Sequence, residues 1–99
     1  MKRLTLSSAV EQDLAEIAEH IAADRPSAVG QVLDALEAAC RLIAEHPGVG
    51  RVRDEIDEGA RSFSVGSYVL FYYTDERNVG IARILHARRD ITTAFHIEA

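Results

Sequence analysis

The feature that most constrains this chain is a change in hydrophobic periodicity near Gly50. Before it, apolar residues recur every three or four positions, which is the spacing of amphipathic helices. After it, residues 61–65 alternate, and residues 68–73 form an unbroken run of β-favouring side chains. A chain of 99 residues that changes from helical to strand spacing in this way predicts an α+β fold.

The first half of the chain is typical of two helices joined by a short turn. Ser7 and Ser8 are candidate N-caps, and Glu11 completes a Ser-x-x-Glu capping box from Ser8. The apolar residues of this helix share an arc of roughly 100°, and they are Val10, Leu14, Ile17, Ala18 and Ile21. Pro26 suits the first turn of a second helix, whose apolar face is Val29, Val32, Leu33, Leu36, Cys40 and Ile43. We expect an antiparallel helical hairpin.

The remaining segments predict strands. Residues 3–6 alternate and are expected to form a first strand, residues 51–56 could form an edge strand, and residues 61–65, 68–73 and 79–86 are separated by short turns. Short turns join only antiparallel neighbours. The predicted fold is therefore α+β, with an N-terminal strand, a two-helix hairpin, and an antiparallel β-meander that packs against the hairpin on one face. One domain is expected over residues 1–99.

Both faces of the strand over residues 68–73 are apolar, which is typical of a sheet covered on two sides. The hairpin can cover only one side. The other side requires a cover, which could be the C-terminal tail, a second copy or a partner. The alternative is that Tyr68 and Tyr72 simply lie half exposed.

Charge and composition exclude several classes of protein. The net charge of −5 disfavours a general nucleic-acid binder. No signal peptide and no membrane-spanning run is expected, so we expect a cytoplasmic protein, and a single cysteine agrees with a reducing compartment. Neither the histidines nor Cys40 has metal-ligand spacing, so no metal and no cofactor is expected. Cys40 is interpreted as an inert thiol of the core.

The basic groups of the second half are seven arginines, and three of them gather near its end. The cluster comprises Arg83, His86, Arg88, Arg89 and Asp90, and Arg61 of a neighbouring segment could join it. Such a set can bind anions or dock an acidic segment, although surface ion pairs are the alternative reading. Because Arg83 follows the strand alternation, we expect it to be partly buried and paired, with Asp90 as its candidate partner.

Several motifs together resemble the ParE toxins of type II toxin-antitoxin modules. They are PGVGR at residues 47–51, GAR at 59–61, SYVLFY at 67–72 and RILHARRD at 83–90. The resemblance implies the RelE/ParE fold and a bacterial or plasmid-borne toxin of the plasmid-stabilisation type. It also implies neutralisation by a ParD-like antitoxin in a hetero-oligomer, and DNA gyrase as the target.

The same superfamily contains RelE-like ribosome-dependent endoribonucleases. By that resemblance, Arg61 and Arg88 fall on two basic catalytic positions, but the other strand positions carry Phe63 and Val69. The tyrosine position falls on Ala94 or Phe95, neither of which can transfer a proton. Inhibition by protein binding is therefore expected, without catalytic residues. A ribonuclease that uses His86 as its acid stays an alternative, as does an inactive copy that only binds antitoxin.

An antitoxin would need a surface on which to dock. Ala28, Ala35, Ala38 and Leu42 form a second apolar stripe on the second helix, and Tyr68 lies on the sheet that lacks a cover. We expect an antitoxin segment to bind there through helix-in-groove and strand-addition contacts. The alternative is that the stripe packs against the first helix.

Overall fold

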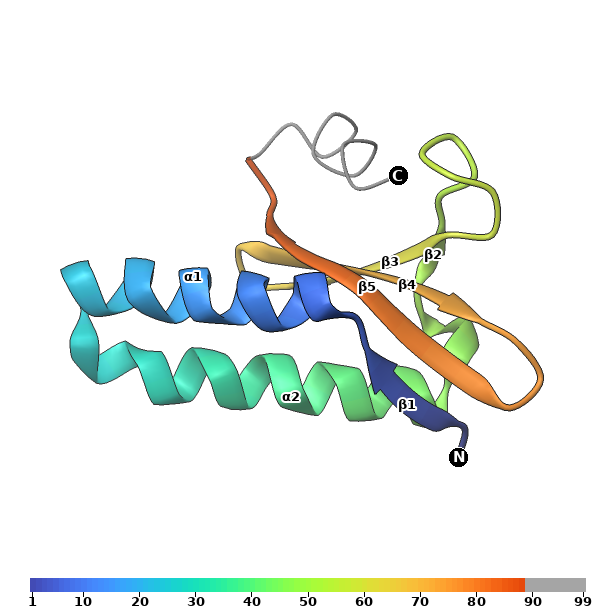
Figure 1. Cartoon of the computed structure of the whole chain (residues 1–99), viewed down its shortest axis with the longest axis horizontal. Helices are drawn as coiled ribbons and strands as arrows, with labels where there is room; N and C mark the ends of the chain where they lie inside the picture. The colour runs from blue at the N-terminus through green and yellow to red at the C-terminus, as the bar shows by residue number, and fades with distance from the viewer. Residues whose placement is uncertain (89–99) are drawn as a thin grey trace.

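The computed structural model describes residues 1–88, which form one five-stranded sheet and two helices (Figure 1). The strands are β1 (Arg3–Leu6), β2 (Arg51–Val52), β3 (Arg61–Val65), β4 (Tyr68–Thr74) and β5 (Asn78–His86). The helices are α1 (Ser8–Asp24) and α2 (Val29–Glu45), and single 3-10 turns over Pro26–Ala28 and Pro47–Val49 follow them. This architecture confirms the predicted α+β fold and helical hairpin.

The sheet has the order β1-β5-β4-β3-β2. The pairs β2–β3, β3–β4 and β4–β5 are antiparallel, so the predicted meander is confirmed. The N-terminal strand β1 pairs with β5 in parallel. The ambiguous stretch over residues 51–56 is a strand only over Arg51–Val52, because the chain turns directly afterwards. Both helices pack on the same face of the sheet (Figure 1).

The start of α1 differs from the prediction. The N-cap is Ser7, whose hydroxyl accepts a hydrogen bond from the Val10 amide at 3.1 Å, so the capping box from Ser8 to Glu11 is wrong. The reason is that Ser7 is also held by the sheet. Its backbone N–H donates to the Ile81 carbonyl and its hydroxyl donates to the Ala82 carbonyl. The pairing of β1 with β5 therefore sets the residue at which the helix begins.

The two faces of β4 are covered differently. Leu70 and Tyr72 face the helices in the main core, whereas Val69 and Phe71 form a second cluster with Ile56 and Leu85. Ile56 comes from the loop between β2 and β3, so this loop supplies part of the cover that the sequence left open. Its neighbour Arg53 places its guanidinium 5.9 Å from the centre of the Phe71 ring, within the range of a cation–π contact.

Tyr72 is fully buried, so the idea that both tyrosines lie half exposed is wrong for Tyr72 and right for Tyr68. The Tyr72 hydroxyl donates to the Pro47 carbonyl at 2.6 Å and accepts from the Gly50 amide at 2.9 Å. Only glycine fits at position 50, because an added Cβ would lie 2.5 Å from that hydroxyl oxygen. Tyr72 thereby ties the turn after α2 to the sheet.

Helix α1 is attached to β5 through a buried ion pair. The Arg83 Nε and Nη2 atoms each donate to the Asp13 carboxylate at 2.9 Å, and the Ile84 amide donates to the same carboxylate at 3.0 Å. Both side chains are almost fully buried, at 8% and 4% exposure. The expected partner of Arg83, Asp90, lies outside the described residues. The carboxylate that faces Arg83 comes instead from α1.

The ion pair lies where β5 loses its strand neighbour. Strand β1 ends at Leu6, opposite Ile81, and the register of β5 against β4 shifts just beyond, between Phe71 and Tyr72. The amide of Ile84 would otherwise face outward at an uncovered edge without a hydrogen-bond acceptor, and Asp13 provides one.

Neither described helix is long and apolar enough to cross a membrane.

Replacing Asp13 by alanine is expected to lower the free energy of unfolding by about 3 to 5 kcal/mol, since a buried arginine then loses its opposing charge. Urea denaturation followed by circular dichroism measures this change. The matched control is Glu16→Ala, which removes an exposed carboxylate of the same helix and should cost less than about 0.5 kcal/mol. A loss below about 1 kcal/mol for Asp13→Ala would mean that the pair does not hold α1 on the sheet.

Candidate functional site

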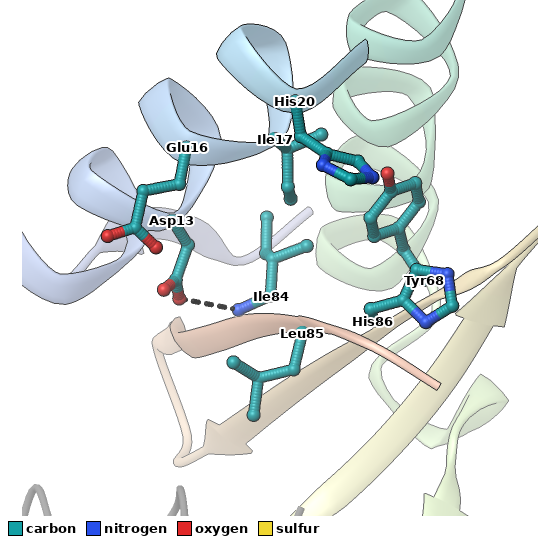
Figure 2. A pocket seen from close by; sticks show the side chains of 8 residues that line it. All are labelled: Asp13, Glu16, Ile17, His20, Tyr68, Ile84, Leu85 and His86. Atoms are coloured by element: carbon teal, nitrogen blue, oxygen red, sulfur yellow. Dashed lines mark hydrogen bonds between the residues drawn. The ribbon is translucent and has the colours of Figure 1, made fainter. Parts of the chain in front are cut away.

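A surface hollow of about 370 Å³ lies between α1 and the ends of β4 and β5 (Figure 2). We call it the histidine hollow. Its lining comprises Asp13, Glu16, Ile17, His20, Tyr68, Ile84, Leu85 and His86. A second hollow shares three of these residues, His20, Tyr68 and His86, and continues to the tip of the hairpin. Two residues predicted as binding residues, Tyr68 and His86, are thus brought together on an accessible surface.

Strand register explains how Tyr68 and His86 meet. They face each other across the β4–β5 pair, and their rings make an edge-to-face contact with centres 5.5 Å apart. The His86 Nδ1 atom accepts a hydrogen bond from the Arg88 amide at 3.1 Å. A neutral His86 ring therefore carries its proton on Nε2, which leaves a donor available to a ligand.

Sequence reasoning missed the contribution of α1 to this hollow. Glu16 and His20 lie one helical turn apart, so both line the hollow beside Ile17 (Figure 2). Asp13, Glu16 and His20 are separated by three and four residues, and this spacing indicates a row of polar side chains along one side of the helix. Among the described residues, no three histidine, cysteine, aspartate or glutamate side chains are placed to hold a metal ion.

Arg61 does not join the predicted arginine cluster. It lies on β3, opposite Tyr72, and β4 separates it from β5. Its Nη1 atom donates to the Gly50 carbonyl at 2.8 Å, which supports the same turn that Tyr72 holds. Arg83 faces Asp13, and Arg88 is exposed just beyond β5, while Arg89 and Asp90 lie outside the described residues. The structure thus separates Arg61 from the other predicted site residues.

Another concave surface lies on the other side of α1. We call it the apolar groove, and it has a volume of about 370 Å³. Its lining comprises Leu4, Leu6, Val10, Leu14, Leu33, Leu36, Glu37, Cys40 and Ile84. Burial, followed by the nearby charge of Glu37, raises the pKa of the Cys40 thiol, in keeping with an inert core cysteine. Leu6 is 46% exposed at the margin of the groove.

The predicted stripe on α2 faces elsewhere. Leu42 is 38% exposed, and Ala35 and Ala38 are exposed as well, so the alternative that the stripe packs against α1 is wrong for these three residues, whereas Ala28 is half-buried in the turn before α2. Leu42 lies about 180° around the helix axis from the groove residue Leu33. The exposed stripe and the apolar groove are therefore different surfaces.

Comparison with known proteins identifies relatives over most of the chain. The family described as "ParE toxin of type II toxin-antitoxin system, parDE" matches residues 4–91. Toxin ParE1 of Caulobacter vibrioides is 36% identical over 89 residues, which cover 87% of this chain and 90% of that protein. Toxin ParE1 of Mycobacterium tuberculosis is 42% identical over 62 residues, which cover 62% of this chain and 63% of the relative.

Two solved structures share the fold. A chromosomal ParDE system from P. aeruginosa matches with a TM-score of 0.78 and 15% identity, over 89% of this chain and 98% of that one. The toxin-antitoxin complex RelBE2 from Mycobacterium tuberculosis matches with a TM-score of 0.59 and 24% identity, over 86% and 96%. These two similarities concern the fold alone. The match of the family to residues 4–91, together with the Caulobacter relative, shows that this chain belongs to the ParE toxin family of type II toxin-antitoxin systems.

Proposed function

We propose that this ParE-family toxin acts by binding DNA gyrase, without catalysis of its own, and that a ParD-like antitoxin neutralises it. The proposal rests on the residues at the strand positions where a RelE-like enzyme needs basic groups, and on the contacts that these residues make. Arg61 is engaged with the Gly50 carbonyl, Phe63 packs against the core under the helices, and Val69 is buried in the second cluster. Phe63 and Val69 carry no charge, and Arg61 uses one of its donors to support the turn after α2.

The exposed polar groups around the histidine hollow are the proposed contacts with the target. Tyr68, His86 and Arg88 lie close together at the end of the sheet, and the Tyr68 ring and the His86 Nε2 donor give the hollow both apolar and polar character. Such a surface suits recognition of a protein. The alternative ribonuclease depends on His86 as a proton donor, which makes this residue the discriminating one.

Expression of the toxin without antitoxin is expected to cause DNA damage signalling and filamentation, since a gyrase poison leaves DNA breaks unrepaired. Purified toxin should inhibit supercoiling by gyrase in vitro. A parallel assay with translating ribosomes measures mRNA cleavage. Cleavage of ribosome-bound mRNA with gyrase unaffected would contradict the proposal, and a protein inactive in both assays would be an antitoxin-binding copy.

Replacement of His86 by glutamine is expected to leave toxicity within about twofold of the wild type, because glutamine keeps an N–H donor for the target and a docking histidine contributes no proton transfer. His46→Gln is the matched control, since His46 is exposed at the end of α2, away from the histidine hollow. Growth inhibition, folding and antitoxin affinity are measured for both variants. A loss of about a hundredfold or more in His86→Gln alone, with folding and affinity intact, would favour the ribonuclease.

The proposed antitoxin site is the apolar groove, with Leu42 as a further contact if the segment wraps around α2. Leu6→Glu is expected to raise the antitoxin Kd by about a hundredfold, since the complex must then bury a charge in an apolar site. Leu42→Glu tests the exposed stripe in the same binding assay. Both positions are exposed, so circular dichroism should show native folding. Wild-type affinity in Leu6→Glu would rule out the groove.

A further inference from the structure

The negative charge of the protein is concentrated on the helical hairpin. Residues 8–45 contain eight acidic and two basic side chains, a net charge of −6, against −5 for the whole chain. The rest of the molecule is thus close to neutral. Any segment that docks on the hairpin approaches a negative potential, which favours positively charged partners and acts most strongly at low salt.

One carboxylate lines the apolar groove and a second lies beside it on α1. Glu37 of α2 belongs to its lining, and its side chain is 68% exposed. On α1, helical spacing places the exposed Glu11 about 60° from the groove residue Leu14, on the side away from the histidine hollow. The groove therefore has an apolar floor, with Glu37 in its lining and Glu11 on the neighbouring face of α1, and we call these two residues its acidic margins.

Basic side chains near the groove do not cancel these charges. Arg41 lies 3.3 Å from Glu37, but both side chains are more than half exposed, and such helix-surface pairs are weak. Lys2 donates to the Asp75 carbonyl in the turn between β4 and β5, and Arg3 is exposed at the start of β1. The carboxylates of Glu11 and Glu37 stay accessible to a bound segment.

From the apolar floor and the acidic margins we infer that the groove binds an amphipathic segment whose apolar face is flanked by lysine or arginine. This inference rests on the proposed role of the groove as the antitoxin site, and it specifies the chemistry of the occupant. An apolar face covers the leucines, while flanking basic groups reach the two margins. An acidic segment would bring like charges together while its apolar face was being buried.

Two synthetic helical peptides with the same leucine face test the inference, one flanked by four lysines and the other by four glutamates. Each carries a fluorescent label and is titrated with the full-length toxin. At about 50 mM NaCl the lysine peptide is expected to bind about tenfold more tightly, and this preference should fall at about 500 mM because salt screens exposed charges. Leu6→Asn removes apolar surface from the groove without adding charge and should weaken binding of both peptides about tenfold, which locates them in the groove.

Charge variants identify the residues responsible. The double variant Glu11→Gln/Glu37→Gln is expected to reduce the preference for the lysine peptide to about twofold or less. The control Glu16→Gln/Glu19→Gln removes the same charge from the sides of α1 away from the groove and should retain the preference. Equal binding of both peptides, tighter binding of the glutamate peptide, or equal loss in the two double variants would overturn the inference.

Failure of this inference can be separated from failure of the proposed function. If neither peptide binds, the groove is not a docking site for an amphipathic helix, whatever the gyrase assay shows. If both peptides bind equally and Leu6→Asn weakens both, the groove stays the docking site and only the charge preference is wrong. The gyrase assay uses no peptide, so its result is independent.

Discussion

The buried pair between Asp13 and Arg83 is the interaction on which the rest of the structure depends. Strand β1 has four residues and β5 has nine, so one edge of β5 has a strand neighbour only over part of its length. Asp13 provides the Ile84 amide with an acceptor and neutralises Arg83 in the same place. Because both groups are buried, the position of α1 over the sheet is fixed within narrow limits.

The placement of α1 creates both concave surfaces for which we propose functions. The histidine hollow lies along one side of the helix and the apolar groove along the other, and Ile84 lines both. A toxin that must bind a target and an antitoxin benefits from surfaces of different character. One surface offers imidazole and phenol groups, while the other offers leucines between carboxylates. The proposed functions of the two surfaces are therefore chemically distinct, although the same helix supports both.

Particular residues show how far local patterns can be interpreted. The burial of Cys40, the exposure of Leu42 and the order of strands in the meander agree with the periodicity of their own segments. Ser7 and Ser8 were both candidate N-caps, and the capping box from Ser8 is wrong because only the bonds from Ser7 to β5 distinguish the two serines. Arg61 was grouped with the later arginines although the predicted meander already places residues 68–73 between their strands, and the structure shows that Arg61 instead donates to the Gly50 carbonyl.

By itself, the sequence determined the kind and order of the elements, the buried face of each helix and the resemblance to ParE toxins, since all of these follow from spacing and motifs within short segments. Only the tertiary structure decided which carboxylate faces Arg83, that Glu16 and His20 join Tyr68 and His86, and where the apolar groove opens. Asp13 and Arg83 are 70 residues apart. Contacts of this kind depend on how separate elements dock, and the periodicity within one element holds no information about its distance from another.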